Sequence, residues 1–415
     1  MQPVNALLPG AGFATGKLLA PKQALVAFFS RVRLASPAIE RIPLDDAFGR
    51  VLARRVDADD DYPSAARSAM DGFAVRAAAS PGTFEIAGEV RMGESSEAPI
   101  GGSQTLRIPT GGVLPPGADA VVPIEDARVE GSRVHVAAAV EFGTNVVPRG
   151  ADMRRGEAIL LPGTRIGAPH AGVLAALGVI EVEVYRRPLI AVFSSGDEIV
   201  PASTQPNAGQ VRDSNRYAIA ASLRAMGAEV RHYPNLADDA GAFQRELSIA
   251  LERCDAVAVS GGSSVGERDR LPGAVAALGD PGIVVHGLRV KPGKPSLLGA
   301  VAGKPILGLP GNPTSALMML EAVFAPIVGA LVGAPVPTAT TTARLAEAAC
   351  GRAGWTWYVP VALGNDGGTP LAHPLPLRSF SVSLTARAGG YLVMEERDAE
   401  LAAGALVTIH RFLGV

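Results

Sequence analysis

The sequence predicts a multidomain α/β protein, and three observations lead to this prediction. The chain has 415 residues, which is too many for one ordinary hydrophobic core. Its composition, 48% apolar and 5% aromatic, is typical of globular α/β domains rather than of disordered chains. Between residues 188 and 330, apolar runs of strand length alternate with segments of helical periodicity. This alternation predicts a central domain built on a doubly wound parallel sheet.

Charge and cysteine content narrow the class of protein further. A formal net charge of −2 gives no reason to expect nucleic acid or an anionic membrane as a partner. The two cysteines are too few for a disulfide framework or a cysteine-rich zinc site, which fits a reducing compartment. The N-terminus does not read as a signal peptide. The apolar run from Ala316 to Gly333 contains Glu321 and Pro326, so we expect a buried helix there and a soluble cytoplasmic protein.

The segments on either side of the first β-rich region predict a linking domain. Residues 1–19 are rich in small and turn-forming residues, and we expect a flexible N-terminus. Pro21 opens a segment of helical spacing, and a second short helix is expected from Asp45 to Arg54. The later run GTRIGAPHAGVLAALGVIEVEVY predicts a helix followed by a strand. Residues 20–58 and 150–185 are therefore expected to form an elongated linking domain of helical and mixed structure.

The other segments predict three further domains. Short runs such as TFEIAGEV, QTLRIPTGG and SRVHVAAAV, separated by Gly and Pro turns, predict a small, mostly β domain over residues 59–149. The runs PLIAVFSS, AEVRHYP and DAVAVSGG predict strands of the α/β domain, residues 186–333, with helices between them. From about Pro335 short strands return, and we expect a C-terminal β domain over residues 334–415.

Two loops follow strands of the predicted parallel sheet, where ligands bind in such folds. They are Ser194–Glu198 and the Gly/Ser-rich run SGGSSVGERD, residues 260–269. The second can form a nest of N–H groups and hydroxyls that holds phosphate or pterin oxygens. It has neither the Walker nor the dinucleotide spacing. A plain strand-ending turn is the alternative interpretation.

The run GLPGNPTSALMML predicts a helix start suited to an anion. Asn312 is a good N-cap residue and Pro313 suits the first helical position, while Gly311 allows close approach to the backbone. Thr314 and Ser315 place hydroxyls in the first turn, where free N–H groups attract negative charge. A buried, well-capped helix that binds nothing is the alternative.

Lysines and acidic residues are further candidates for binding a phosphate or a metal ion. In VKPGKPSLLG, Lys291 and Lys294 flank a Pro-Gly turn, which suits a polyphosphate, although solvated surface lysines are the alternative. Acidic residues at strand or loop ends would suit Mg²⁺ bound between carboxylates and phosphates, although each could instead cap a turn. They are Asp71, Asp152, Glu198, Asp238 and Asp269. The histidines have no ligand spacing, so no transition-metal site is expected.

Eight motifs occur in the order in which a known family has them. They are SAMDGFAVR, RIPTGGVLPPGADAVVPIED, VVPRGADMRRGEAILLPGTRI, AVFSSGDEIV, GQVRDSNRYAI, SGGSSVGERD, VKPGKPSLLG and GLPGNPTSA. With them the chain resembles the molybdopterin molybdenumtransferases, the molybdenum insertases that include the E domain of gephyrin. The resemblance runs from about residue 60 to 320, implies a molybdopterin-binding-like central domain, and loosens towards the C-terminus.

The resemblance implies a reaction and the residues that carry it. The family takes adenylylated molybdopterin and molybdate as substrates, uses Mg²⁺, releases AMP and yields the molybdenum cofactor. The catalytic residues implied are Asp71, Thr110, Glu198, Asp269, Pro310 and Pro313, and the metal ligands are Asp71, Asp152, Glu198, Asp238 and Asp269. The residues implied to bind the nucleotide or pterin are Ser263, Ser264, Gly266, Lys291, Lys294, Gly311, Asn312, Thr314 and Ser315.

The family's assembly is also implied. In its homodimer, Asp71 and Thr110 of one subunit would meet Glu198 and Asp269 of the other. The molybdopterin-adenylylating enzyme and downstream molybdoenzymes are further implied partners.

The sequence departs from the family pattern at three arginines. Arg67 stands before SAMDG, where the family usually has an Asp-Asn pair, and Arg268 and Arg270 flank Asp269, with Arg270 in place of an aromatic residue. An arginine can stack or bind phosphate, so the substitutions leave two alternatives to an insertase. One is a specialised or catalytically inactive paralogue that acts as a cofactor-binding scaffold. The other is a nucleotide-dependent transferase with a different substrate. The acidic candidates are all present, which favours the enzyme.

Overall fold

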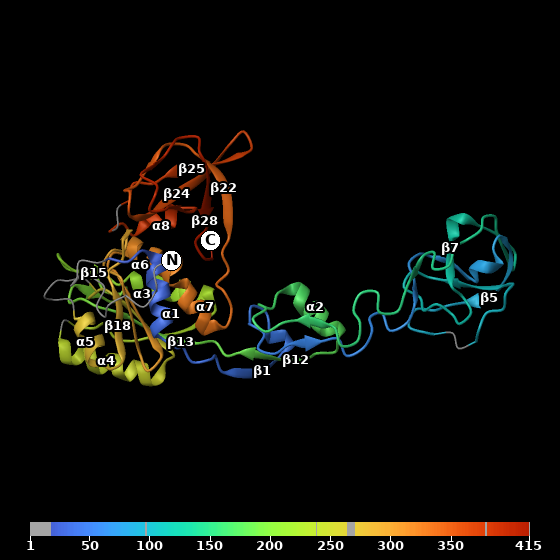
Figure 1. The fold of residues 1–415 in the computed structure, drawn as a ribbon, viewed down its shortest axis with the longest axis horizontal. Helices are drawn as coiled ribbons and strands as arrows, with labels where there is room; N and C mark the ends of the chain where they lie inside the picture. The colour runs from blue at the N-terminus through green and yellow to red at the C-terminus, as the bar shows by residue number, and fades with distance from the viewer. Residues whose placement is uncertain (1–17, 96–97, 238, 264–269, 378–379, 415) are drawn as a thin grey trace. The chain divides into compact units, whose positions relative to one another are not determined.

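The structure is a computed structural model that describes residues 18–95, 98–237, 239–263, 270–377 and 380–414. The chain divides into two compact units, whose helices and strands are labelled in Figure 1. The first unit contains Met1–Ile42, Gly49–Ala53 and Glu183–Val415, and the second contains Pro43–Phe48 and Arg54–Val182. Each unit has its own sheets and its own hydrophobic core.

A six-stranded sheet in the order β16-β13-β17-β21-β20-β18 forms the centre of the first unit. Its strands are β13 (Leu189–Ser194), β16 (Glu229–His232), β17 (Ala256–Ser260), β18 (Pro281–His286), β20 (Leu297–Val301) and β21 (Lys304–Leu309). The first four in spatial order pair in parallel, as the sequence predicts.

Two strands at one edge of this sheet differ from the predicted parallel arrangement. β20 pairs antiparallel with β21, and β18 pairs antiparallel with β20. The two-residue turn Ala302–Gly303 between β20 and β21, in which both residues have positive φ, causes the antiparallel pairing of these two strands. Such a short connection can join only antiparallel neighbours, because a parallel crossover needs a dozen residues or more.

Helices cover both faces of the central sheet, and the alternation of side chains along its strands separates two cores. Ile190 and Val192 of β13 belong to one core, with α1 (Pro21–Arg31), α3 (Asn215–Met226) and the helical stretch near the C-terminal end of the domain. Ala191 and Phe193 belong to the other, with α4 (Ala240–Arg253) and α5 (Leu271–Ala277). Both faces are therefore buried, as a parallel sheet requires.

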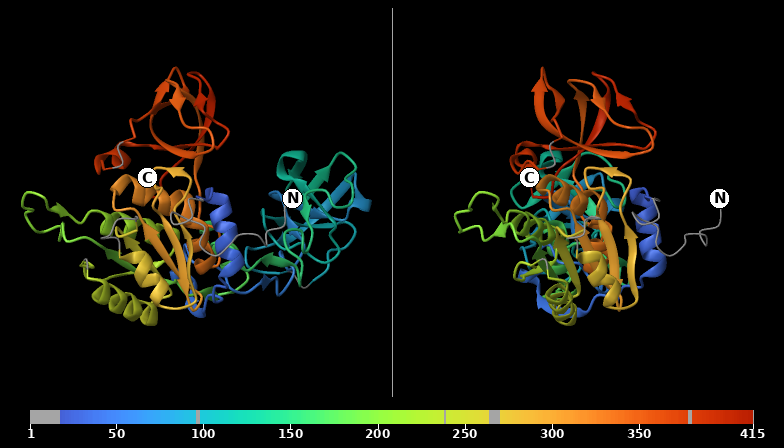
Figure 2. Two further views of the ribbon diagram at one scale, coloured as in Figure 1. Left: turned by 60° about the vertical axis from the view of Figure 1, so that its left-hand side comes forward. Right: turned by 90° about the vertical axis from the view of Figure 1, so that its left-hand side faces the viewer.

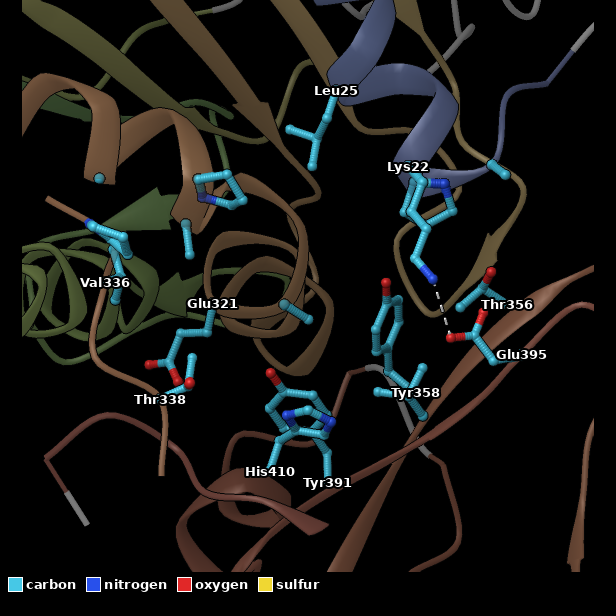
Figure 3. Close-up of a pocket in the computed structure, with 18 of the residues that line it drawn as sticks. Lys22, Leu25, Glu321, Val336, Thr338, Thr356, Tyr358, Tyr391, Glu395 and His410 are labelled. Atoms are coloured by element: carbon cyan, nitrogen blue, oxygen red, sulfur yellow. Dashed lines mark hydrogen bonds and ion pairs between the residues drawn. The ribbon is translucent and has the colours of Figure 1, made fainter. Parts of the chain in front are cut away.

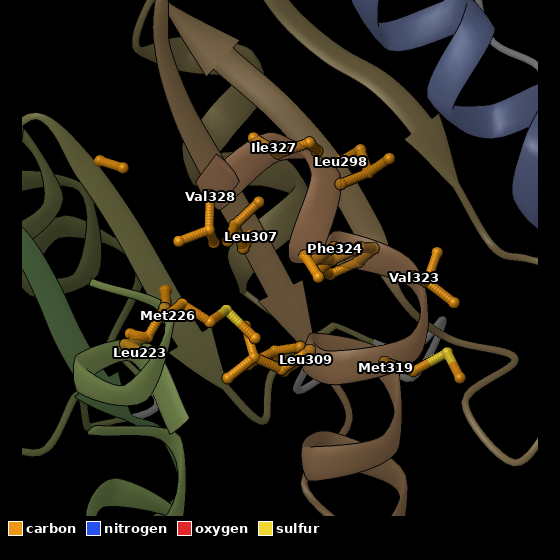
Figure 4. Close-up of a cluster of buried hydrophobic side chains, with 14 of the residues drawn as sticks. Leu223, Met226, Leu298, Leu307, Leu309, Met319, Val323, Phe324, Ile327 and Val328 are labelled. Atoms are coloured by element: carbon orange, nitrogen blue, oxygen red, sulfur yellow. The ribbon is translucent and has the colours of Figure 1, made fainter. Parts of the chain in front are cut away.

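The longest helical stretch runs from Pro313 to Val332 and fills the first of these cores (Figure 4). It consists of α6 (Pro313–Met319), a π-helical turn η6 (Leu320–Phe324) and α7 (Ala325–Val332). By length and composition it could cross a membrane, but 72% of its apolar window is buried in the protein. This burial is what the sequence predicts from Glu321 and Pro326 within the run.

The C-terminal segment of the first unit forms a closed β-barrel (Figure 2). Pairing runs from β24 through β25, β22, β28 and β26 back to β24, and β19 adds to β24 from outside. The strands are β19 (Val290–Lys291), β22 (Thr340–Leu345), β24 (Thr356–Asp366), β25 (Thr369–Pro374), β26 (Gly390–Met394) and β28 (Leu406–His410). Smaller elements are β23 (Ala349–Cys350), β27 (Glu400–Leu401) and helix α8 (Ser383–Arg387).

The second unit is built on a six-stranded sheet in the order β7-β4-β6-β5-β9-β8. The strands are β4 (Gly72–Val75), β5 (Gly82–Glu89), β6 (Gln104–Ile108), β7 (Ala120–Pro123), β8 (Ala127–Glu130) and β9 (Arg133–Val136). Short antiparallel pairs join β2 (Val56–Asp57) to β11 (Ala158–Leu160) and β3 (Arg67–Ser68) to β10 (Val146–Val147), and α2 spans Ala168–Ala176. The short runs of the sequence thus form a mostly β structure.

The remaining segments form two short strand pairs, and one prediction from the sequence is wrong there. β1 (Ile39–Pro43) pairs with β12 (Glu181–Tyr185), and β14 (Ile199–Val200) pairs with β15 (Val211–Arg212). The helix expected from Asp45 to Arg54 is absent from this described segment, which has only the 3₁₀ turn Leu44–Asp46. Gly49 has φ of +75°, in the left-handed region that ends a helix, and Leu52 instead forms an antiparallel bridge with Val184.

Leu19, which the sequence prediction includes in a flexible N-terminus, is ordered in the structure. Residues 1–17 lie outside the described residues. Leu19 is buried and forms a parallel bridge with Leu288, and its carbonyl accepts a hydrogen bond from the Arg289 N–H at 2.8 Å. Leu19, two residues before α1, is therefore part of the core of the first unit.

The core around the helical stretch gives a stability prediction. Phe324 is fully buried in the first core, so Phe324→Ala should lower the free energy of unfolding by about 3–5 kcal/mol through lost burial and a residual cavity. Phe380, in the same unit, is 71% exposed, and Phe380→Ala should change it by less than about 0.5 kcal/mol. Urea unfolding followed by tryptophan fluorescence reports on this unit, because both tryptophans lie in it. Equal shifts in the two variants would contradict the prediction.

Candidate functional site

Three loops leave the same edge of the central sheet because the parallel strands before them end in register. Ser194 of β13 is aligned with Ser260 of β17, and Ser260 with Leu309 of β21. The loops are held together by backbone hydrogen bonds from the Ser195 N–H to the Ser260 carbonyl at 2.9 Å and from the Gly261 N–H to the Leu309 carbonyl at 3.0 Å. Polar residues far apart in the sequence thus meet at one edge, as expected for a ligand site in this fold.

Gly261 is required for this close approach. Its φ is +92°, and a Cβ at this position would lie 2.6 Å from the carbonyl oxygen of Ser195. Ser263, two residues on, donates from its hydroxyl to the Leu309 carbonyl at 3.3 Å, and its own carbonyl contacts His286 Nε2 at 2.8 Å. Ser263 is therefore buried and engaged in structure. Ser264, Gly266, Arg268 and Asp269, which the sequence also assigned to this loop, lie outside the described residues.

The loop before α6 is pinned from beneath by Asn215, at the start of α3. The Asn215 side-chain amide donates to the Gly311 carbonyl and to the Ser260 hydroxyl, both at 2.7 Å. The Ser260 hydroxyl in turn donates to the Pro310 carbonyl at 3.4 Å. Because Asn215 and Ser260 are buried, this link fixes the loop without occupying its exposed side. Asn215 lies within a matching motif but was not among the predicted site residues.

The start of α6 has the predicted position but not all of the predicted contacts. Asn312 occupies the N-cap position with extended backbone, and its side chain makes no capping hydrogen bond. The Thr314 hydroxyl donates to the Ser381 carbonyl at 2.8 Å, so it contributes to the structure. Gly311 and Asn312 are exposed, whereas Pro310 and Ser315 are buried. The N–H groups of the first turn have no intrahelical partner and leave this end of the helix positive.

A pocket of about 500 Å³ lies beside this helix start, and we call it the anion pocket. The Lys291–Lys294 turn forms one side, the helix start with Asn312 and Ser315 forms another, and the barrel supplies Arg352, Trp355 and Trp357. Its described lining contains three cationic side chains, Lys291, Lys294 and Arg352, and no carboxylate. Such a site favours a ligand with several anionic oxygens.

The two tryptophans of the chain orient these cations. Strand β19 pairs with β24 so that Lys291 lies opposite Trp357, and the Lys291 ammonium lies 4.3 Å from the centre of the Trp357 ring. The Arg352 guanidinium lies 5.4 Å from the centre of the Trp355 ring. Both distances are within the range of cation–π attraction. The motif GRAGWTWY suggests that Trp355 and Trp357 lie on the same face, since residues two apart in an extended chain share a face. The sequence alone could not place Trp357 near Lys291.

Glu198 lies in the loop after β13, and its side chain is exposed. Its carboxylate folds over the Cα of Gly196, where a Cβ would collide with it. The Gly196 carbonyl accepts a hydrogen bond from the Asn235 side-chain amide at 2.8 Å, which holds the loop. Glu198 is not part of the lining of the anion pocket. Gly196 has φ of +136°, a backbone conformation that favours glycine.

In the second unit, Asp71 and Thr110 meet directly. Asp71 Oδ1 accepts hydrogen bonds from the Thr110 N–H at 2.7 Å and from the Thr110 hydroxyl at 3.0 Å. These two donors, the N–H foremost, hold the pKa of the Asp71 carboxyl below its ordinary value, so it is ionised at neutral pH. Within the described part of the chain, the other carboxylate oxygen, Oδ2, has no hydrogen-bond partner. Arg67 approaches the same corner, donating to the Gly111 carbonyl at 2.7 Å.

The other predicted metal ligands are not assembled into one cluster by the described residues. Asp152 is exposed, and its N–H donates to the Tyr62 carbonyl at 3.0 Å. Asp238 and Asp269 lie outside the described residues. Over the described ranges, no group of three or more His, Cys, Asp or Glu side chains could hold a metal ion.

Comparison with known proteins gives three consecutive matches to family models. They are "MoeA N-terminal region (domain I and II)" over residues 19–178, "Probable molybdopterin binding domain" over residues 191–330, and "MoeA C-terminal region (domain IV)" over residues 342–412. These matches follow one another along most of the chain.

Individual relatives agree with the family models. A molybdopterin molybdenumtransferase of Nostoc sp. is 35% identical over 304 residues, which cover 71% of this chain and 70% of the relative. One from Synechocystis sp. is 31% identical over 371 residues, covering 87% and 92%. The crystal structure of a molybdopterin biosynthesis MoeA protein from Pyrococcus horikosii has a TM-score of 0.81 and 30% identity, covering 96% of this chain and 100% of that one.

The fold, the loops at the carboxyl edge of its sheet and these matches define an α/β protein built around a molybdopterin-binding-type domain. The chain belongs to the molybdopterin molybdenumtransferase family.

The Asp71–Thr110 contact gives a prediction about ionisation. Thr110→Val removes the hydroxyl donor and keeps the N–H donor, so the pKa of Asp71 should rise towards its ordinary value. Thr110→Ser keeps both donors and should leave the pKa of Asp71 low. The measurement is a pH titration of the Asp71 side-chain carbon signal by NMR with selectively labelled aspartate. An unchanged pKa in Thr110→Val would show that the hydroxyl does not stabilise the carboxylate.

Proposed function

We propose that this chain is a molybdenum insertase, which transfers molybdate to adenylylated molybdopterin and releases AMP in an Mg²⁺-dependent reaction. Family membership supports the transferase class and the place in molybdenum cofactor biosynthesis. The single observation that carries the finer proposal is the anion pocket. It joins two lysines, an arginine and the start of a buried helix around a space of about 500 Å³ without a described carboxylate.

The anion pocket suits molybdate or the phosphates of the substrate. Lys294 and Arg352 would attract the oxyanion, while the pairing with Trp357 keeps Lys291 at the wall of the pocket. Ser315 and Asn312 would contribute polar contacts at the positive end of the helix. Since hydrogen bonds from charged donors are stronger than neutral ones, these cations would dominate the affinity.

Asp71 fits a ligand of Mg²⁺. Its carboxylate is ionised at neutral pH, and Thr110 fixes one oxygen while leaving the other without a described partner. Glu198 is a second exposed carboxylate with a fixed loop beneath it. Mg²⁺ bound by such residues neutralises charge on phosphate oxygens and so favours cleavage of a phosphoanhydride. Thr110 keeps the Asp71 carboxylate charged and oriented for this role.

We further propose that the enzyme is a cytoplasmic homodimer, in which Asp71 and Thr110 of one subunit and Glu198 of the other serve one site. In this arrangement Asp71 and Glu198, which lie in different units of the chain, would bind the same Mg²⁺. Asp269, Asp238 and Asp152 are retained as further metal ligands in this proposal. The molybdopterin-adenylylating enzyme would supply the substrate, and molybdoenzymes would take up the product.

The reaction itself is the first test. Purified protein with Mg²⁺, molybdate and adenylylated molybdopterin should release AMP in a molybdate-dependent manner. Asp71→Ala and Glu198→Ala should each abolish turnover, because each removes a proposed metal ligand, while circular dichroism shows an intact fold. Wild-type rates in both variants would exclude the proposed metal site. Tight binding of the pterin without turnover would favour a cofactor-binding scaffold.

The shared site can be tested by mixing the two inactive variants. In a mixed dimer of Asp71→Ala and Glu198→Ala subunits, one site carries both substitutions and the other carries neither. After subunit exchange, half of the dimers are mixed, so about a quarter of the wild-type activity should return. If each subunit builds its own site, the mixture stays inactive, which would contradict the shared arrangement.

The anion pocket can be tested without turnover. The two tryptophans both line it, so molybdate or AMP bound there should change the intrinsic tryptophan fluorescence. Lys294→Ala should weaken binding by about tenfold or more, since it removes a charged donor. Lys22→Ala is the matched control, because this lysine is highly exposed and lies outside the anion pocket. Equal affinities in the two variants would exclude a role for Lys294.

A further inference from the structure

A second and larger cavity lies in the first unit, apart from the anion pocket. Its volume is about 1320 Å³, and none of the residues that line it line the anion pocket. Its walls come from the start of α1, the helical stretch Pro313–Val332 and the barrel strands β24, β26 and β28 (Figure 3). We call it the tyrosine pocket, after Tyr358 and Tyr391, which line its barrel side.

The two pockets lie on opposite sides of the strand that begins at Thr356. Trp355 and Trp357 line the anion pocket, whereas Thr356 and Tyr358 line the tyrosine pocket. Because successive side chains of a strand point to opposite faces, this alternation gives β24 one row of residues for each pocket. The tyrosine pocket is therefore a separate space and not an extension of the proposed active site.

Two tyrosines with buried rings line the tyrosine pocket, and their hydroxyls have no hydrogen-bond partner among the described residues. Tyr358 is 4% exposed and Tyr391 is 7% exposed, and neither hydroxyl makes a hydrogen bond to another described group. Figure 3 shows the Tyr358 hydroxyl directed into the open centre and the Tyr391 hydroxyl on the side of Glu321. Neither hydroxyl oxygen is one of the buried polar atoms that lack a partner, so both reach the open space of the pocket and can bond to a polar ligand there.

Glu321 is the carboxylate that faces this cavity from the helical stretch. Its Oε1 accepts a hydrogen bond from the Ser222 hydroxyl at 2.8 Å, and its Oε2 accepts one from the Leu413 N–H at 3.0 Å. Within the described part of the chain it has no cationic partner. Burial raises the pKa of Glu321, as it does for a carboxyl without a compensating positive charge.

The other charged groups of the lining differ from Glu321, because they are paired within the protein. Lys22 contacts Glu395 at 3.5 Å, Glu396 pairs with Arg289 at 2.8 Å, and Arg397 approaches Asp398 at 3.7 Å. His410 stacks on Tyr391 with ring centres 5.4 Å apart, and burial lowers its pKa, so it is neutral at pH 7. No described positive charge therefore compensates Glu321, and aromatic rings stand beside it.

We propose that the tyrosine pocket binds a small organic cation, an ammonium or guanidinium group carried on an apolar body. The cation would pair with Glu321 beside Tyr358 and Tyr391, which line the same pocket. The unpartnered hydroxyls would receive its remaining polar contacts. Leu25, Ala322 and Val336 on the opposite side would cover the apolar body. The cation would bind here whether or not the chain is an insertase.

The test compares two probes of similar size, 4-phenylbutylamine, which is cationic at pH 7, and 4-phenylbutanol, which is neutral. Isothermal titration of the full chain should show the amine binding at least about tenfold more tightly than the alcohol, because only the amine can pair with Glu321. Glu321→Gln should remove this advantage. Tyr391→Phe should weaken the amine several-fold. Lys294→Ala, in the anion pocket, should leave both affinities unchanged.

Several results would overturn the proposal. They are no binding of the amine to the wild-type chain, equal affinity for amine and alcohol, an undiminished advantage of the amine in Glu321→Gln, or loss of amine binding in Lys294→Ala. Thermal melting checks the fold of each variant. Should Glu321→Gln fail to fold, Tyr391→Phe decides: unchanged amine affinity there overturns the proposal, and weakened affinity supports it.

Discussion

Parallel pairing of β13, β17 and β21 brings Ser194, Ser260 and Leu309 to one edge of a sheet that is buried on both faces. The rest of the site depends on this register. A shift by one residue would turn each strand's side chains to the other face and exchange the two cores. Because both faces of these strands are apolar, the hydrophobic pattern of a single strand does not fix its register. Packing against the neighbouring elements is needed as well. Asn215 and Gly261 add the polar and steric contacts that hold the loops in one arrangement.

The helical stretch Pro313–Val332 links this edge to the core. Its first turn stands at the anion pocket, while Phe324 and its neighbours are buried against the sheet. Burial of the later part of the stretch thus holds the helix in place. The free N–H groups of its first turn can therefore face a ligand. The barrel completes the pocket from the other side with an arginine and two tryptophans.

The sequence predicted the elements of the central domain well because their periodicity is local. The alternation of residues 188–330 indicates strands and helices without knowledge of their neighbours. It did not indicate that β20 pairs antiparallel with β21, which follows from the short turn at Ala302–Gly303, or that β18 pairs antiparallel with β20. The helix expected near Asp45 was wrong, because the left-handed backbone of Gly49 and the bridge at Leu52 outweigh local propensity.

The candidate site was predictable in part for the same reason. The lysine turn and the GNPTS helix start were recognisable as separate anion motifs, and the structure brings them to one pocket. The contribution of Arg352, Trp355 and Trp357 required the fold, since pairing of β19 with β24 places Trp357 opposite Lys291 across a long sequence separation. The Thr314 hydroxyl, a predicted ligand contact, donates a hydrogen bond to the Ser381 carbonyl. No local sequence pattern predicts this contact. The roles of Asp71, Glu198 and the other site residues stay predictions.

The alternation of side chains along β24 has a thermodynamic consequence. One strand forms a wall of both pockets, so any displacement of β24 by a ligand beside Tyr358 would alter the wall of the anion pocket at Trp357 as well. Any coupling free energy carried in this way is reciprocal: occupancy of either pocket changes the affinity of the other by the same factor. A cation in one cavity and an oxyanion in the other would then act as mutual effectors without contact.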